Sequence, residues 1–297
     1  MGEKDIAEKN LEAFNDVFAD IVNVLLFKGN KLMKEKDLES AVKDSMFKAD
    51  GKIHQQERDV SKFWKNGEVR ISIFGFENQT KQDPKMPLRV ISYDGASYKQ
   101  QLLDNEKDKT KDTKKKSLYP VVTLVLYFGT DEKWSTHKNL LSCFKVPEEL
   151  KPFVNDYKIN VFNIAWLSDK TIDMFQSDFK IVAKYFQTVR LKRDYKGSNE
   201  EIRHVDALLK MLSALTGDNS FEEVYNVGNL KKGGVTMCEV VEKIKNEGRN
   251  EGVLAGKAEL VRKMLDAKLV TEQQIADLLK ISVKEVKKIA AKVPVQA

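Results

Sequence analysis

Hydrophobic residues recur along the chain at two spacings, which predict interspersed helices and strands. Spacing of three and four residues, typical of amphipathic helices, covers 11–27, 87–103, 169–191 and 200–215. Alternating or continuous apolar runs, typical of strands, cover 54–79, 119–128 and 157–166. A weaker helical pattern lies within 31–50, around Leu38 to Met46. The run at 119–128 is nearly continuously apolar, which favours the buried centre of a sheet.

Residues 54–79 are predicted to form a hairpin, because Lys65-Asn66-Gly67 is a strong turn signal. Side chains two apart on a strand share a face, so Glu77 and Gln79 point the same way as the apolar residues before them. Such a strand can hold a hard oxygen ligand at the edge of the core, where Mg²⁺ keeps some of its waters. Asp59, on the preceding strand, supplies a second carboxylate.

The register of this hairpin decides whether the two acids can share one ion. A two-residue turn at Asn66-Gly67 places Asp59 opposite Phe74, on the face away from Glu77. A shared metal needs Asp59 opposite Gly75 or Glu77, so the chemistry requires a longer loop or a bulge, for which Gly75 is a plausible position. The alternative is that each acid is simply solvated at the end of its strand.

The helix at 87–103 carries a candidate phosphate contact. Arg89 and Tyr93 are four residues apart and therefore share one stripe of the helix, next to the acid-bearing strand. They are candidates to contact a scissile phosphate and to order the site. The alternative interpretation packs Tyr93 in the core and leaves Arg89 on its rim.

Several stretches, in one order, resemble a known family. They are Glu57-Arg58-Asp59, Phe76-Glu77-Asn78-Gln79-Thr80, Met86-Pro87-Leu88-Arg89, Tyr119-Pro120-Val121-Val122 and Tyr127-Phe128-Gly129. Over roughly 11–230 the chain resembles the Rpn family of recombination-promoting nucleases and transposase-like proteins, within the PD-(D/E)XK nuclease superfamily. Gln79 stands where that superfamily has Lys, and since Gln cannot accept the proton, the activation of the attacking water is left open.

The resemblance implies an α/β fold with a PD-(D/E)XK nuclease-like core, in which helices flank a central mixed sheet. It implies a DNA endonuclease linked to recombination or mobile elements, with Mg²⁺ or Mn²⁺ held by Asp59 and Glu77 and water oriented by Gln79. In this fold a helix before the first strand contributes an extra acid, so Asp16 and Asp20 are candidates. Their alternative is a solvated helix face.

Two other functions stay open. A chain that kept the fold but lost efficient cleavage through the Lys to Gln change would be a DNA-binding or oligomeric partner protein. A toxin or defence nuclease acting on RNA is the third interpretation. The enzyme needs Asp59 and Glu77 within reach of one ion, whereas the binding protein needs only the basic C-terminal tail.

The expected organisation is a nuclease-like domain over 1–230, with a charged insert at 104–116, and a helical extension over 235–297. Gly248, Gly252 and Gly256 line up small residues in that extension and favour self-association into a homo-oligomer. Residues 271–289 resemble a helix-turn-helix, although Lys280 stands where Gly is usual. Its second helix would present three lysines to DNA, namely Lys284, Lys287 and Lys288.

Composition limits the class of protein. The chain has 297 residues, 41% hydrophobic and 32% charged, with a formal net charge of +6, which is compatible with a polyanionic partner. Its apolar runs are shorter than the ~20 residues that span a bilayer, and no signal peptide is evident, so a cytoplasmic protein is expected. Cys143 and Cys238 are too few for a disulfide framework. The three histidines form no ligand motif.

Overall fold

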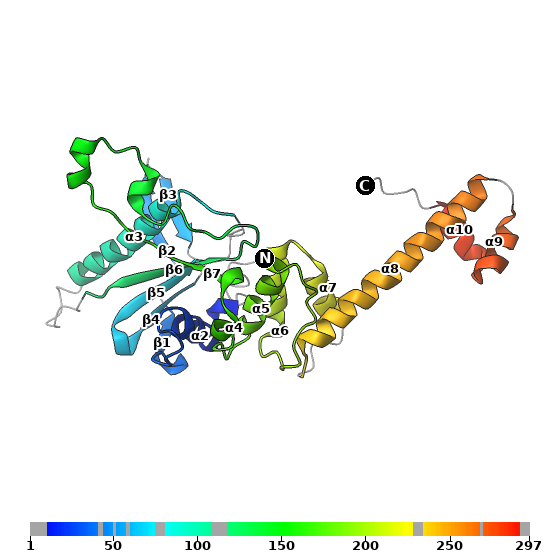
Figure 1. The fold of residues 1–297 in the computed structure, drawn as a ribbon, viewed down its shortest axis with the longest axis horizontal. Helices are drawn as coiled ribbons and strands as arrows, with labels where there is room; N and C mark the ends of the chain where they lie inside the picture. Colours follow the sequence, from blue (N-terminus) through cyan, green and yellow to red (C-terminus); the bar gives the residue numbers. More distant parts are fainter. Residues whose placement is uncertain are drawn as a thin grey trace. The chain divides into compact units, whose positions relative to one another are not determined.

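The computed structural model describes residues 11–40, 44–49, 52–57, 60–74, 81–107, 118–227, 234–267 and 270–291. The chain divides into two compact units, Met1–Cys238 and Glu239–Ala297. Figure 1 shows the fold of both units, and each is described by itself.

The first unit is built on a five-stranded mixed sheet with the order β1-β4-β5-β6-β7. Its strands are β1 (Leu38–Ser40), β4 (Val60–Trp64), β5 (Val69–Phe74), β6 (Val121–Tyr127) and β7 (Asn160–Asn163). The β1-β4 and β4-β5 pairs are antiparallel, whereas β5-β6 and β6-β7 are parallel. Two further strands, β2 (Asp44–Ala49) and β3 (Lys52–Glu57), form a separate two-stranded antiparallel sheet. The expectation of an α/β fold with a central mixed sheet is confirmed.

Helices cover both faces of this sheet (Figure 1). The helices of the first unit are α2 (Asn15–Leu25), α3 (Met86–Lys107), α4 (Asp169–Ile172), α5 (Phe179–Arg190), α6 (Val205–Thr216) and α7 (Ser220–Val227). α3 packs Met86, Val90 and Tyr93 against the face of the sheet that carries Val125. On the opposite face, Lys62 of β4 lies over the ring of Phe18 in α2.

A buried carboxylate ties α3 to the sheet. Asp94 of α3 is 2% exposed and accepts hydrogen bonds from the hydroxyls of Thr123 in β6, at 2.6 Å, and of Tyr157, just before β7. Arg70 of β5 is also buried, and its Nε donates to Ser61 Oγ at 2.9 Å. Burial lowers the pKa of the Arg70 guanidinium, and the charges of Tyr119 and Asp94 oppose that effect. Opposite charges therefore share the layer between α3 and the sheet.

Two sequence predictions of secondary structure are wrong. The weak helix expected within 31–50 is replaced by β1 and β2, because pairing of Leu38 with Trp64 overrides a local helical tendency. The single helix expected over 169–191 is split into α4 and α5. The break is stabilised by Asp20, whose Oδ2 accepts from the backbone N–H groups of Gln176 and Ser177, each at 2.8 Å.

The second unit holds most of the long helix α8 (Met237–Asp266), followed by α9 (Glu272–Leu279) and α10 (Val283–Ala291). Its core contains Val261 of α8, Ile275 and Ala276 of α9, and Val286 of α10. Thr271 and Gln274 form a capping box at α9, and Lys280 ends that helix in the left-handed conformation, with φ of 52°. A residue with a Cβ thus occupies the position where Gly is usual, at a steric cost. In the part of the chain that is described, no helix is long and apolar enough to cross a membrane.

Asp94→Ala should destabilise the first unit, because it removes the buried acceptor of the Thr123 and Tyr157 hydroxyls and a negative charge that acts on Arg70. We expect a loss of about 2 to 5 kcal/mol in the free energy of unfolding, measured by urea denaturation. Asp104→Ala is the matched control, since Asp104 is exposed on the same helix. It should change stability by less than about 0.5 kcal/mol. Equal effects of the two substitutions would contradict a structural role for Asp94.

Candidate functional site

The three residues expected to do the chemistry, Asp59, Glu77 and Gln79, lie outside the described residues. What the structure gives is the hairpin that leads to them. β4 and β5 pair from Trp64 opposite Val69 to Val60 opposite Ile73. The shared metal site therefore stays a prediction. The observed register of β4 and β5 limits how Asp59 and Glu77 could approach one ion.

The pairing of β4 with β5 has the register that a two-residue turn at Asn66-Gly67 would produce, although the observed turn is longer. Residues 65–67 form a 3-10 turn, and Glu68 adopts the left-handed conformation, with φ of 47°. A Cβ on Gly67 would lie 2.3 Å from an atom of the Trp64 ring, so glycine is required there by this close approach. The longer loop leaves the register unchanged. A metal shared by Asp59 and Glu77 therefore requires a register change beyond the Val60–Ile73 pair.

Arg89 and Tyr93 adopt the second of the two expected arrangements. Tyr93 is 8% exposed and packs in the core under α3. Arg89 lies on the rim, where its guanidinium donates to Asp83 Oδ2 at 3.3 Å. Burial alone would lower the pKa of Arg89, but hydrogen bonds to Asp83 and Tyr93 outweigh it and raise that pKa. A contact of Arg89 with substrate phosphate stays a prediction.

Asp16 and Asp20 make contacts within the first unit. Asp16 accepts from His204 Nε2 at 3.0 Å and lies 3.8 Å from the Arg203 guanidinium. The ring of His204 also stacks on Phe14, with centroids 3.8 Å apart. Asp20 holds the α4–α5 break already described. Both acids thus connect α2 to later parts of the chain, and neither is a simply solvated side chain.

Another acid at this end of the chain was not anticipated. Glu12 lies in the 3-10 turn η1 (Leu11–Ala13) and is fully buried. Nearby in sequence, Asn15 Oδ1 accepts from Lys62 Nζ of β4 at 2.6 Å, and Lys62 is only three residues from Asp59. Helical spacing gave no signal for Glu12, because the α-helix begins only at Asn15 and the preceding turn has a different periodicity.

An open pocket of about 840 Å³ lies at the carboxyl ends of the parallel strands, and we refer to it as the carboxyl-end pocket. Ligands of α/β sheets commonly bind at this edge. The lining residues follow β5, β6 and β7 in turn: Lys81, Gln82 and Pro84, then Tyr127, Asp131, Glu132, Lys133, Ser135, Thr136 and His137, then Trp166. Lys81 comes two residues after Gln79 in the chain.

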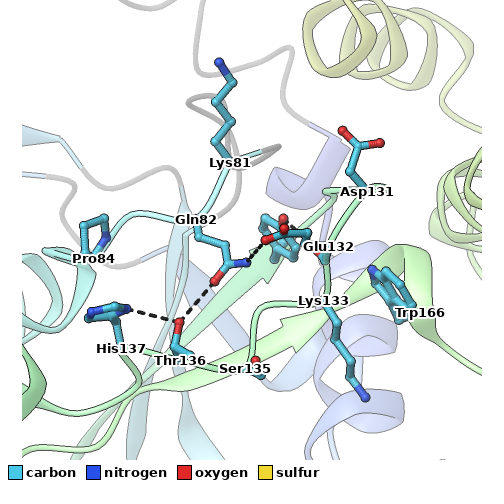
Figure 2. A pocket seen from close by; sticks show the side chains of 11 residues that line it. Lys81, Gln82, Pro84, Asp131, Glu132, Lys133, Ser135, Thr136, His137 and Trp166 are labelled. Carbon is cyan, nitrogen blue, oxygen red and sulfur yellow. Dashed lines mark hydrogen bonds between the residues drawn. The ribbon is translucent and has the colours of Figure 1, made fainter.

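Polar side chains of the pocket form a connected chain (Figure 2). The Gln82 amide donates to Glu132 Oε2 and accepts from Thr136 Oγ1, both at 3.4 Å. His137 Nδ1 lies 3.1 Å from the same Thr136 hydroxyl. Burial raises the pKa of Tyr127, and the negative charges of Glu132 and Asp131 add to the shift, so this phenol stays protonated at neutral pH.

The loop that follows β6 is held in place by Trp134, which is fully buried. Its backbone N–H donates to Asn163 Oδ1 and its indole N–H donates to Thr136 O, both at 2.7 Å. This loop therefore forms a fixed wall of the pocket. The sequence analysis missed the pocket residues, yet a signal existed for part of the lining: the residues from Asp131 to His137 come shortly after the apolar run at 119–128.

The three lysines expected to contact DNA, Lys284, Lys287 and Lys288, are exposed on α10. Lys287 lies 3.5 Å from Glu272 of α9, which is a weak surface ion pair. Among the described residues, no group of three or more His, Cys, Asp or Glu side chains is placed to hold a metal ion.

Comparison with known proteins identifies the family. No significant match was found among curated proteins or among solved structures. The family described as "Putative transposase, YhgA-like" matches residues 65–216, which is just over half of the chain and includes Glu77, Gln79, Arg89 and most of the carboxyl-end pocket. The resemblance seen in the sequence is thus confirmed, and the chain belongs to this YhgA-like transposase family.

Proposed function

We propose that this protein is a divalent-metal-dependent DNA endonuclease with a PD-(D/E)XK nuclease-like core, linked to recombination or mobile elements. Membership of a transposase family suggests a function related to mobile elements and DNA as the partner. An antiparallel β4-β5 hairpin followed by a helix and a parallel strand fits the resemblance to the nuclease fold.

One structural observation supports the proposal in addition to family membership. The carboxyl-end pocket begins at Lys81, and six residues connect it to the end of β5 at Phe74. Glu77 and Gln79 are among those six. The segment that bears the expected acid therefore leads directly into a ligand-sized pocket at the carboxyl ends of the parallel strands.

Asp59 and Glu77 would hold Mg²⁺ or Mn²⁺, with a backbone carbonyl near Asn78 as a further ligand. Carboxylate and carbonyl oxygens are the donors that these hard cations prefer. When bound, the ion supplies positive charge that polarises the phosphodiester and acidifies water. The fit depends on the register change between Ile73 and Glu77 that the hairpin requires, since the described part of the ladder would direct the two acids to opposite faces.

The remaining roles belong to neutral and cationic side chains. Gln79 would orient the attacking water through its amide, which can donate and accept hydrogen bonds but carries no charge. Arg89 would contact phosphate from the rim of α3, where Asp83 now holds its guanidinium. That ion pair is half-buried, so a phosphate would have to replace the contact with Asp83 for Arg89 to act in this way.

A non-catalytic DNA-binding role is the second candidate, and the hairpin register favours it. If the two acids stay on opposite faces, they cannot share an ion, and DNA binding by the basic α10 would be the remaining function. Oligomerisation through the C-terminal helices stays a proposal. Val253, Leu254 and Leu260 of α8 are exposed apolar residues that such an assembly could cover.

Loss of either acid should abolish cleavage. We expect Asp59→Ala and Glu77→Ala to stop Mg²⁺-dependent nicking of plasmid DNA, because a neutral shell cannot replace ligand charge, while DNA binding is retained or strengthened. EDTA should also stop nicking by the unaltered protein. Glu149→Ala, which removes an exposed acid of η6 (Glu148–Phe153), is the control and should nick normally. Cleavage insensitive to both acid substitutions would locate the catalytic centre elsewhere.

Gln79 substitutions separate water orientation from metal binding. Gln79→Ala should reduce the nicking rate by about 10² to 10³, the effect of one hydrogen bond lost in the transition state. Gln79→Lys should retain or improve activity, since Lys is the usual residue in the superfamily. An inactive unaltered protein that becomes active with Gln79→Lys would instead support the DNA-binding candidate.

Removal of the tail should weaken DNA affinity and leave cleavage intact. A chain ending at Gly248 is suitable, because Val235 and Met237 are buried and should be kept. We expect the dissociation constant for duplex DNA to rise and its dependence on salt to become shallower, since fewer lysines contact phosphates. The triple substitution of Lys284, Lys287 and Lys288 by Gln should reproduce the effect if α10 is responsible. An unchanged affinity and salt slope would remove DNA contact from the tail.

A further inference from the structure

We propose that the carboxyl-end pocket receives one unstacked nucleobase of a DNA strand, with Trp166 as the surface on which it stacks and with Gln82, Glu132 and His137 facing its polar edge. The inference rests on DNA being the partner, as in the proposed function, but not on cleavage. It assigns a ligand subsite to residues that no part of the catalytic proposal uses.

Trp166 is fixed in a way that suits stacking. Its indole N–H donates to Gly129 O at 3.1 Å, and the guanidinium of Arg190 lies 4.7 Å from the centre of its ring. Arg190 is itself anchored, since its Nε donates to Ala165 O at 2.7 Å. The ring is half-exposed and lines the pocket. An aromatic ring held by its own partners offers a base a surface that costs little ordering on binding.

The charges of the lining indicate a base and not a phosphate. Lys81 and Lys133 are balanced by Asp131 and Glu132, so the pocket is close to neutral when His137 is neutral. A pocket built for phosphate alone would have an excess of cationic or backbone N–H groups. A nucleobase, in contrast, is neutral and presents donors and acceptors at one edge.

The polar side chains of the pocket can exchange their present hydrogen bonds for hydrogen bonds to a ligand. Both hydrogen bonds of the Gln82 amide, to Glu132 and Thr136, are 3.4 Å long, near the outer limit for such bonds. The bonds that hold the pocket wall through Trp134 are 2.7 Å long. A ligand edge can therefore replace the contacts of Gln82 and Glu132 without loosening the wall. Amides and carboxylates of this kind pair with the edges of adenine and cytosine.

The size of the pocket determines whether a bound base can remain stacked and paired in a duplex. A volume of about 840 Å³ is in the range of small-ligand pockets and accommodates a nucleotide. A duplex is about 20 Å wide and cannot enter such a space with its bases stacked. The base must therefore be unpaired or turned out of the helix, as in other enzymes that bind single bases of DNA.

The test is titration of the full chain with oligonucleotides in EDTA, monitored by tryptophan fluorescence and by anisotropy of labelled DNA. A 12-mer single strand should quench fluorescence, whereas its fully paired duplex and an abasic strand of equal length should quench much less. The chain has three tryptophans, so Trp166→Phe should remove most of the quenching, and the control Trp64→Phe should keep it. Trp166→Ala should weaken single-strand binding by about 5- to 150-fold.

Equal quenching by the abasic strand would overturn the base pocket in favour of a phosphate site. Unchanged binding by Trp166→Ala, with DNA still bound, would overturn it while leaving the endonuclease proposal intact. Absence of binding to every DNA in EDTA would overturn the base pocket, and nicking with Mg²⁺ would then test the endonuclease proposal by itself. Base-dependent quenching by a protein that does not cleave would support the pocket and reject only catalysis. The comparison of intact and abasic strands uses the unaltered protein and so holds even if Trp166→Ala fails to fold.

Discussion

The first unit depends on the buried carboxylate of Asp94. A carboxylate out of contact with water is tolerated only when its hydrogen bonds are satisfied, and here the partners are Thr123 of β6 and Tyr157, in the segment that precedes β7. The Gln101 amide adds a second link, since it both donates to Tyr119 O and accepts from Tyr119 N–H, just before β6. These contacts fix the position of α3 along the strands, and with it the place of Arg89 and of the loops that form the carboxyl-end pocket.

Where local pattern and tertiary structure agreed, the sequence was informative. The helix at 87–103, the apolar strand at 119–128 and the two short helices of the tail all appear, with boundaries shifted by a few residues. The secondary-structure predictions failed where contacts between residues distant in the sequence determine the structure. Leu38 belongs to a strand because Trp64 pairs with it, and the 169–191 helix breaks because Asp20, some 150 residues earlier in the chain, binds its backbone. Neither partner is visible from local spacing.

The candidate site likewise has one part that the sequence predicts and another that it does not. Asp59, Glu77 and Gln79 were predicted from the sequence because they resemble a motif, and their role stays a prediction, since they lie outside the described residues. The family match covers Glu77 and Gln79. The carboxyl-end pocket was not predicted, because its walls come from three loops that converge only when β5, β6 and β7 are aligned. The hairpin register is the structural observation that bears on the predicted motif. The pairing of β4 with β5 up to Ile73 constrains which face of the sheet each acid can occupy.

The walls of the carboxyl-end pocket belong to loops, whereas the expected acids belong to the hairpin and the segment that follows it. Loops tolerate substitution and changes of length better than the strands that carry them. If both proposals hold, base preference and hydrolysis depend on different segments of the chain, and each can change without the other. A different loop after β6 would leave the sheet, the buried carboxylate under α3 and the hairpin in place, and would change only the base that the pocket is proposed to receive.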